Sequence, residues 1–279
     1  MTCGKLACSQ PGCQPAGTMS NTILEVCCAS ADFAVAAAAA GADRVELCDN
    51  LIEGGTTPSV GAVALTAARS GVPVMAMVRP RGGDFLYSQL ELDVMLRDID
   101  ALGSAGASGL VFGVLDTNGR VDRERTRRLV DAARPLSVTF HRAFDLSRDL
   151  DESLDTLAEL GVDRVLTSVG RASVLDDLDR LAALVDRAAG SLVVMPGGGI
   201  RPHNIEAVAT VPGVTEIHVG ATKRRPSGME YRRDGVPMGA PYEPDEYLVE
   251  EADVARIAQA KSRLSLVGMD VRGGRGGDA

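Results

Sequence analysis

The sequence predicts a (β/α)8 barrel, in which eight parallel strands form a ring surrounded by helices. Short runs rich in β-branched and apolar residues alternate eight times with longer Ala- and Leu-rich stretches of helical character. The fingerprint G-x-G-x-x-G, which a doubly wound open sheet usually carries after its first strand, does not follow Ile23–Cys27. The chain has 279 residues, of which 45% are hydrophobic, and this is enough to bury the core of such a barrel.

Each expected strand is followed by a loop, a helix and a turn. The strands are Ile23–Cys27, Arg44–Cys48, Pro73–Arg79, Gly109–Leu115, Leu136–Phe140, Asp163–Ser168, Leu192–Pro196 and Thr215–Gly220. The clearest helices between them are Ser30–Gly41, Glu91–Gly106, Ser153–Gly161 and Ser173–Gly190, and one more is expected near Glu246–Leu264. Several of these helical stretches close on a glycine, as a helix C-cap requires.

The rest of the chain is expected to flank this single barrel domain, which spans residues 22–220. Residues 1–21 are rich in Gly, Pro and Gln and read as a disordered leader, with Met19 as an alternative start to Met1. Residues 221–265 form a C-terminal extension with an irregular segment and a helix that packs on the barrel. Residues 266–279 end in RGGRGGDA and are expected to be a disordered tail.

Charge and composition exclude several classes of function. The formal net charge is −9 and the pI is about 4.9, so a broad basic surface for nucleic acid or an anionic membrane is not expected. No run approaches the ~20 apolar residues of a membrane span, and the first 21 residues lack the apolar core of a secretion signal. We therefore expect a cytoplasmic protein whose six cysteines are thiols.

Side-chain alternation along the strands places polar groups inside the barrel. Glu25 and Cys27 share one strand face, and Glu46 and Cys48 repeat this arrangement. Because helices cover the outside of a barrel, these polar faces are expected to point to its axis. Buried carboxylates need partners, and Arg79 is the expected partner of Glu25 or Glu46. A purely structural ion-pair core is an open alternative.

Polar and glycine residues gather where the expected strands end, which is where barrels of this class place their sites. If the protein is an enzyme, the candidates for catalysis are Glu25, Glu46, Arg79, His141 and Asp145. The candidates for binding an anion are Arg81, Gly197, Gly198, Gly199, Arg201 and Gly220. The glycines are equally compatible with simple turns. None of the three lysines lies on one of the eight expected strands, which argues against Schiff-base chemistry.

Several motifs resemble those of the CutC copper homeostasis family. They are LEVCCAS, GADRVELCDNLIEGGTTPSVG, VRPRGGDFLYS, GLVFGVLDTNGRVD, PLSVTFHRAFD, DRVLTS and VVMPGGGI, in that order. The resemblance implies a cytoplasmic (β/α)8 barrel, often homo-oligomeric, that is associated with copper handling and in some members with Cu(I) binding. Cys27 and Cys48 match positions proposed for copper in relatives. The extra thiol of Cys28, TSVG in place of TSG, and the Cys-bearing leader depart from the pattern.

Two classes of function therefore remain. In the first, Cys27 and Cys48 lie side by side at the barrel mouth and bind Cu(I), which prefers thiolates, while Cys28 points away. Arg79 and Arg81 are expected to lower the thiol pKa values. In the second, the barrel is an enzyme that acts on a small phosphorylated or polyol-like metabolite, and the two cysteines only fill a strand end.

Overall fold

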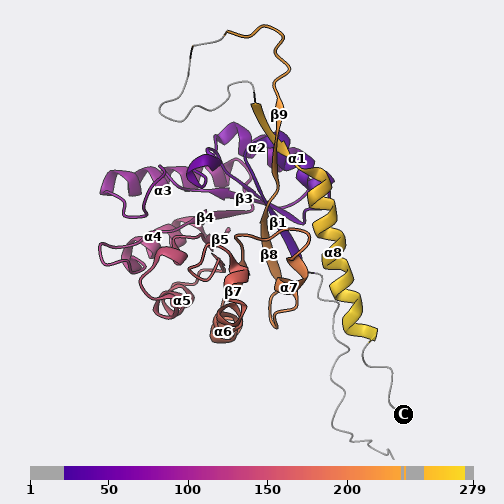
Figure 1. Cartoon of the computed structure of the whole chain (residues 1–279). Coiled ribbons are helices and arrows are strands. Elements are labelled where there is room, and N and C mark those ends of the chain that lie inside the picture. The colour runs from indigo at the N-terminus through magenta and orange to yellow at the C-terminus, as the bar shows by residue number, and fades with distance from the viewer. Residues whose placement is uncertain (1–21, 234–235, 237–247, 274–279) are drawn as a thin grey trace, which may run out of the picture.

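The computed structural model describes residues 22–233, 236 and 248–273 and confirms the predicted barrel (Figure 1). The eight strands are β1 (Ile23–Cys28), β2 (Arg44–Leu47), β3 (Val74–Met77), β4 (Gly109–Phe112), β5 (Ser137–Phe140), β6 (Arg164–Thr167), β7 (Val193–Pro196) and β8 (Glu216–Gly220). All ladders are parallel, in the order β7-β6-β5-β4-β3-β2-β1-β8. Strands β7 and β8 lie side by side, so the ring is nearly closed.

Helices follow the strands and form the outer layer (Figure 1). They are α1 (Ala31–Ala39), α2 (Val60–Arg69), α3 (Gln89–Ser104), α4 (Arg123–Ala133), α5 (Leu150–Glu159), α6 (Leu178–Ala188) and α7 (Ile205–Ala209), with short 3-10 turns η1 (Leu51–Glu53), η2 (Phe144–Leu146) and η3 (Val174–Asp176). Side-chain caps begin the first six helices, because a short polar side chain accepts a hydrogen bond from an otherwise unpaired backbone N–H. The capping residues are Ser30, Ser59, Ser88, Asp122, Asp149 and Asp177.

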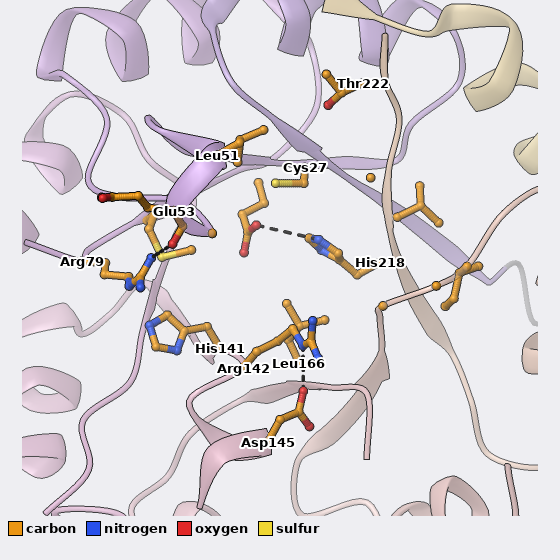
Figure 2. A pocket seen from close by; sticks show the side chains of 18 of the residues that line it. Cys27, Leu51, Glu53, Arg79, His141, Arg142, Asp145, Leu166, His218 and Thr222 are labelled. Atoms are coloured by element: carbon orange, nitrogen blue, oxygen red, sulfur yellow. Dashed lines mark hydrogen bonds and ion pairs between the residues drawn. The ribbon is translucent and has the colours of Figure 1, made fainter. Parts of the chain in front are cut away.

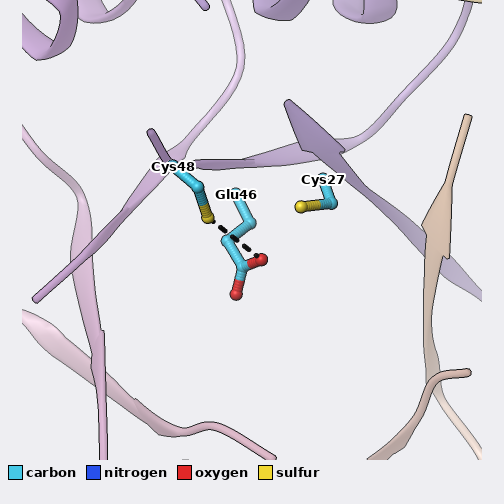
Figure 3. Close-up of side chains that lie close together, drawn as sticks. All are labelled: Cys27, Glu46 and Cys48. Carbon is cyan, nitrogen blue, oxygen red and sulfur yellow. Dashed lines mark hydrogen bonds between the residues drawn. The ribbon is translucent and has the colours of Figure 1, made fainter. Parts of the chain in front are cut away.

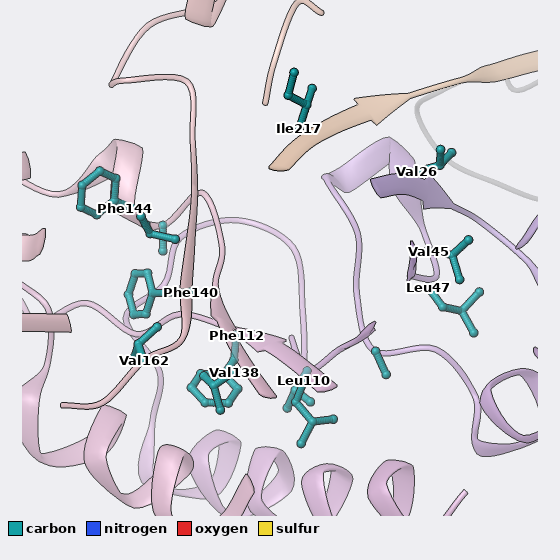
Figure 4. Packing of buried hydrophobic residues seen from close by; sticks show 14 of the residues in the cluster. Val26, Val45, Leu47, Leu110, Phe112, Val138, Phe140, Phe144, Val162 and Ile217 are labelled. Carbon is teal, nitrogen blue, oxygen red and sulfur yellow. The ribbon is translucent and has the colours of Figure 1, made fainter. Parts of the chain in front are cut away.

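The two faces of the strands divide as the alternation predicts. On the outer face, Val26, Leu110 and Phe140 are fully buried against the surrounding helices (Figure 4). On the inner face, Glu25 and Glu46 are buried within the ring together with charged residues of other strands. The prediction that the polar faces point to the barrel axis is therefore confirmed, and the burial of apolar surface between strands and helices supplies the main stabilisation of the fold.

The segment after β8 differs from the expectation. Part of the segment expected to be irregular forms the strand β9 (Thr222–Pro226), which pairs antiparallel with β10 (Leu248–Ala252), a strand within the stretch expected to be the last helix. The last helix, α8 (Val254–Gly273), begins later and ends later than expected, so that it includes residues 266–273 of the predicted tail. It packs against α1 and α7, and its Lys261 Nζ lies 2.6 Å from Oδ2 of Asp43, which directly precedes β2. The strand β9 was not predicted because its residues are mostly charged and show no apolar alternation. In the structure these side chains pair across the ladder with Glu250 and Glu251.

The expected leader, residues 1–21, and the last part of the expected tail, residues 274–279, lie outside the described residues. Among the helices that are described, none is long and apolar enough to cross a bilayer.

Candidate metal and ligand site at the barrel mouth

A pocket of about 640 Å³ opens at the carboxyl ends of the strands (Figure 2). Its floor includes Cys27, Glu46 and His218, which come from β1, β2 and β8. Its walls include His141 and Arg201, from the loops that follow β5 and β7. Strand ends that are far apart in sequence are thus brought to one cavity, as expected for this fold.

Two thiols and one carboxylate lie close together where β1 and β2 end (Figure 3). The potential ligand atoms of Cys27, Glu46 and Cys48 all lie within 4.8 Å of one another. Cys48 donates to Glu46 Oε2 over 3.6 Å. Cys28 lies on the opposite face of β1, where it is fully buried in the outer apolar core and donates to the carbonyl oxygen of Val26. The prediction from side-chain alternation, that Cys28 points away from Cys27 and Cys48, is therefore confirmed.

The surroundings of Cys48 are apolar and closely packed. Its buried side chain lies with Met75, Met77 and Val111 in a small cluster inside the barrel, against which Cys27 packs. A Cβ atom on Gly55 would lie only 3.1 Å from the Cys48 sulfur, and Gly55 has a left-handed φ of +91°. Glycine is therefore required where this loop covers the thiol. The result is a thioether-lined environment beneath the partly exposed Cys27.

Beneath the thiols, the inner face carries a network of buried ion pairs. Arg44 Nε donates to Glu25 Oε2 over 2.5 Å, and the same guanidinium binds Glu216. Arg164 binds Glu216 from β6, with one contact of 3.0 Å. His218 Nδ1 lies 2.8 Å from Glu25 Oε1, and its Nε2 lies 3.9 Å from Glu46 Oε2. His218 thus joins this network to the thiol cluster.

The network sets the ionisation of the groups above it. Burial opposes the charge of Glu25, but the hydrogen bond from His218 and the charge of Arg44 outweigh it and lower the Glu25 pKa to about 2. The Cys48 thiol, acting against burial and assisted by His218, lowers the pKa of Cys27 to about 5. Burial and the charge on Cys27 raise the pKa of Glu46. The cluster therefore concentrates thiolate character on Cys27.

Arg79 and Arg81 do not act as expected. Arg79 donates to the backbone oxygens of Glu53 and Gly55, both over 2.7 Å, and so fixes the loop after β2 rather than pairing with Glu25 or Glu46. Arg81 lies outside the pocket lining and pairs with Glu91 over 2.6 Å. The expectation that these arginines lower the thiol pKa is wrong, because Cys48 and His218 have that effect on Cys27.

Asp145 lines the pocket, but its carboxylate is fully engaged. It accepts hydrogen bonds from the Thr167 hydroxyl over 2.5 Å, from the Ser168 amide over 2.9 Å and from the Gly170 amide over 3.0 Å. It also accepts from Arg142 Nε over 2.7 Å. A carboxylate with this many donors is held in one position. These hydrogen bonds join the loops after β5 and β6, and a catalytic role for Asp145 stays a prediction.

In the glycine loop after β7, some residues line the pocket and one continues the strand ladder. The Gly197 amide continues the strand ladder by donating to the carbonyl oxygen of Thr167. Gly198, Gly199 and Arg201 line the pocket, as does Gly220 at the end of β8. Of the residues expected at an anion site, these four are brought together, while Arg81 and Gly197 are not.

Three residues of the inner network were not among the expected site residues, although alternation along the last strand predicts that His218 points inward with Glu216. Arg44, Arg164 and His218 stand on three different strands, and each points inward. A signal was available for Arg44, which shares its strand parity with Glu46 and Cys48. For Arg164 no local signal existed, because an arginine at the first residue of a strand also fits an exposed position.

Comparisons with known proteins point to one family. The sequence profile of the CutC family matches residues 22–223. The human copper homeostasis protein cutC homolog is 46% identical over 242 residues, which cover 87% of this chain and 89% of the human protein. A CutC family protein of Chromobacterium violaceum is 46% identical and is covered to 98%, against 88% of this chain.

Solved structures give the same result. The crystal structure of CutC from Streptococcus agalactiae superimposes with a TM-score of 0.66 at 34% identity, covering 71% of this chain and 98% of that chain. Phosphoribosylanthranilate isomerase from Thermotoga maritima has a TM-score of 0.53 at 11% identity, covering 88% of this chain and 98% of the isomerase, and shows a shared barrel fold alone.

Proposed function

The chain belongs to the CutC family, and from this premise we propose that it is a copper homeostasis protein that binds Cu(I) through Cys27 and Cys48. The observation that supports this most strongly is the convergence of the two sulfurs on the Glu46 carboxylate within 4.8 Å. Cu(I) is a soft cation that prefers thiolate and thioether ligands, and two thiolates are sufficient for it.

The donor set fits this metal on two further grounds. Metal binding requires deprotonated thiols, and the Cys27 pKa of about 5 provides a thiolate at neutral pH. In addition, Glu46 Oε1 is buried without a hydrogen-bond partner in the described part of the chain. Such an atom is rare in native proteins and suggests a missing ligand or water. Cys27 faces the pocket and provides a path of entry.

The test is a competition titration with a Cu(I) chelator under reducing conditions. The starting protein is the full chain in which Cys3, Cys8 and Cys13 are replaced by serine, so that the leader thiols do not contribute. We expect about one Cu(I) per chain. Cys27→Ser and Cys48→Ser should each weaken binding by at least about a hundredfold, because a single remaining thiolate loses the chelate effect.

Cys28→Ser is the matched control. It removes a thiol from the adjacent position of the same strand, but Cys28 lies in the outer core and should leave the Cu(I) affinity unchanged. Unchanged affinity in Cys27→Ser or Cys48→Ser would reject the site. Binding that is lost with the three leader substitutions alone would place the copper on Cys3, Cys8 and Cys13.

Assembly into a homo-oligomer stays a prediction based on the family resemblance. Light scattering of the purified full chain tests it, and a mass of one chain, 29.1 kDa, would contradict it.

A further inference from the structure

The pocket contains a second group without a partner, on the wall away from the thiols. His141 follows β5 and is 4% exposed, with its ring against Phe85 at a centroid distance of 4.7 Å. A Cβ atom on Gly113 would lie 2.6 Å from the imidazole Cε1 and Nδ1. The absence of a side chain at Gly113 therefore makes the space that this ring occupies. Figure 2 shows His141 between Arg79 and Arg142.

The hydrogen bonding of His141 fixes its tautomer. The backbone N–H of Ala143 donates to His141 Nδ1 over 3.2 Å, so Nδ1 is an acceptor and carries no proton. Burial and the charge of Arg79 lower the His141 pKa to about 3, so the ring is neutral at physiological pH. The ring proton must then be on Nε2, which makes Nε2–H a donor that cannot switch to an acceptor.

This donor is unused. In the described part of the chain, His141 Nε2 is buried and has no hydrogen-bond partner. Native proteins rarely bury a donor without a partner, unless a ligand or water occupies the complementary position. Asp145, which follows closely in sequence, does not take this role, because its oxygens are engaged by Thr167, Ser168, Gly170 and Arg142.

The loop after β7 offers further hydrogen-bond donors that face the same pocket. Gly198 and Gly199 have left-handed φ values of +92° and +76°, and within the described residues neither amide donates a hydrogen bond. A Cβ atom on Gly199 would lie 2.1 Å from Ser173 Oγ, so the loop can approach Ser173 only with glycine there. Successive backbone amides in a turn form a concave surface that favours anions.

Arg201 adds a positive charge to this loop. Its Nη1 donates to the carbonyl oxygen of Ile200 over 2.8 Å, and no ion pair between described residues includes its guanidinium. Arg142, by comparison, is already neutralised by Asp145. Arg201 is therefore the cation of this pocket wall that is free to bind an incoming anion.

We propose that the pocket is a binding site for a small anionic carbonyl compound, whose carbonyl oxygen accepts from His141 Nε2–H and whose carboxylate or phosphate binds Arg201 and the amides of Gly198 and Gly199. A pocket of about 640 Å³ has the size of a small-molecule site. Leu166 and Ile200 also line the pocket and give it apolar surface. This site is on the wall opposite the thiols and does not rest on copper binding.

The test is calorimetric titration of the metal-free full chain with two pairs of probes. The carboxylate pair is 2-oxoglutarate and glutarate, and the phosphate pair is dihydroxyacetone phosphate and inorganic phosphate. In at least one pair, the compound with the carbonyl should bind about tenfold more tightly, since one hydrogen bond to a buried fixed donor is gained. The pair that shows this preference identifies the anionic group.

Variants assign the two ends of the ligand. His141→Phe retains a ring against Phe85 but removes Nε2–H, so it should abolish the preference for the carbonyl compound and leave the binding of its counterpart unchanged. Arg201→Gln should weaken both members of the pair by about tenfold. His203→Phe is the matched control, because His203 is exposed and does not line this pocket. It should change neither affinity.

A measurement on the unmodified chain guards against a variant that fails to fold. Long-range proton–nitrogen NMR should show His141 as the neutral Nε2–H tautomer at pH 7, with an Nε2 signal that shifts when the carbonyl probe is added. A charged imidazolium, equal binding within both pairs, no binding at millimolar concentration, or a preference that survives His141→Phe would each overturn the proposal. Copper binding plays no part in these results, so its failure would be seen separately.

Discussion

The two halves of the barrel interior differ in how their polar groups are partnered. In the amino-terminal half, Arg44 and Arg164, the first residues of β2 and β6, bind Glu216, the first residue of β8. No nitrogen or oxygen of these three side chains is buried without a partner in the described chain. At the carboxyl-terminal mouth, Glu46 Oε1 and His141 Nε2 are both buried and unpartnered.

This difference distinguishes polar groups that stabilise the fold from polar groups that are available to bind a ligand. A buried ion-pair network in which every group is satisfied resists change, because removing one member leaves an uncompensated charge. Unsatisfied buried groups have the opposite effect, since they cost stability unless something binds to them. The same barrel thus uses charged residues for architecture at one end and keeps reactive groups available at the other. This comparison makes predictions for each half.

The largest effect is expected for Arg44→Met. This substitution keeps much of the side-chain volume but leaves Glu25 and Glu216 without their shared cation. We expect the free energy of unfolding to fall by about 3–5 kcal/mol, as measured by urea denaturation at pH 7. Arg123→Gln is the matched control, because it breaks an exposed ion pair with Glu159 and should cost less than about 1 kcal/mol. Equal losses in the two variants would show that the inner network is not special.

Acid should reveal the contribution of Glu25. Its pKa is about 2 in the folded protein, against an ordinary value of 4.5, so the unfolded chain takes up the proton first as the pH falls. The stabilisation, about 3 kcal/mol, is therefore complete above pH 4.5 and is lost as the pH falls towards 2. The free energies of unfolding of wild type and Glu25→Gln should differ by this amount at pH 7 and converge near pH 2.

Glu159→Gln, at the exposed pair, should show no comparable convergence. If the difference between wild type and Glu25→Gln were as large at pH 2 as at pH 7, the stabilisation would come from packing and not from the charge of Glu25.

The sequence was sufficient for the barrel and for the faces of its strands, since both follow from local periodicity. Glu25, Cys27, Glu46 and Cys48 all point inward as their spacing predicts. The ion-pair partners of these residues could not be predicted in this way. Two inward-facing residues come into contact only if their strands are close in the barrel and they lie at the same height along its axis. Arg44 reaches Glu25 from the neighbouring strand, whereas Arg79, chosen for its position near a strand end, is taken by backbone carbonyls.

The sequence predicted which residues lie at the barrel mouth, but not which of them have hydrogen-bonding groups without a partner. The sequence indicated that His141, Asp145 and Arg201 gather there, and all three line the pocket. It had no signal that Asp145 is saturated by hydrogen bonds while His141 is left with a free donor, because both outcomes depend on loop conformation. Whether a residue at a strand end is available for chemistry is thus decided by tertiary hydrogen bonds.

A smaller effect is expected on the rates at which the thiols of Cys27 and Cys28, adjacent residues of β1, are alkylated. The low pKa of Cys27 and its exposure to the pocket favour alkylation, whereas burial raises the pKa of Cys28 well above its usual value. Iodoacetamide at pH 7 should modify Cys27 at least about a hundredfold faster, as followed by tandem mass spectrometry of reduced metal-free protein. The Cys27 rate should reach half its maximum near pH 5. Equal rates at the two positions would contradict the division of the faces.

The smallest change in stability is expected for Glu46→Gln, on the strand next to Glu25. Burial raises the Glu46 pKa, so the folded protein retains a proton that the unfolded chain loses above about pH 4.5. Wild-type stability therefore falls as the pH rises above this value, and the glutamine variant avoids that loss. Urea denaturation of metal-free protein at pH 8 should place Glu46→Gln within about 1 kcal/mol of wild type, or more stable.

Glu25→Gln under the same conditions is the comparison that gives this result its meaning. Both glutamates are buried on the inner face of neighbouring strands, and both substitutions remove a carboxylate of the same size. They differ in partners: Glu25 is held by Arg44 and His218, while Glu46 keeps a buried oxygen with none in the described chain. If Glu46→Gln lowered the free energy of unfolding as much as Glu25→Gln, the polar groups of the carboxyl-terminal mouth would stabilise the fold as strongly as those of the amino-terminal half. A neutral or stabilising result instead means that Glu46 is kept at a cost in the free protein, as expected for a group that awaits a ligand.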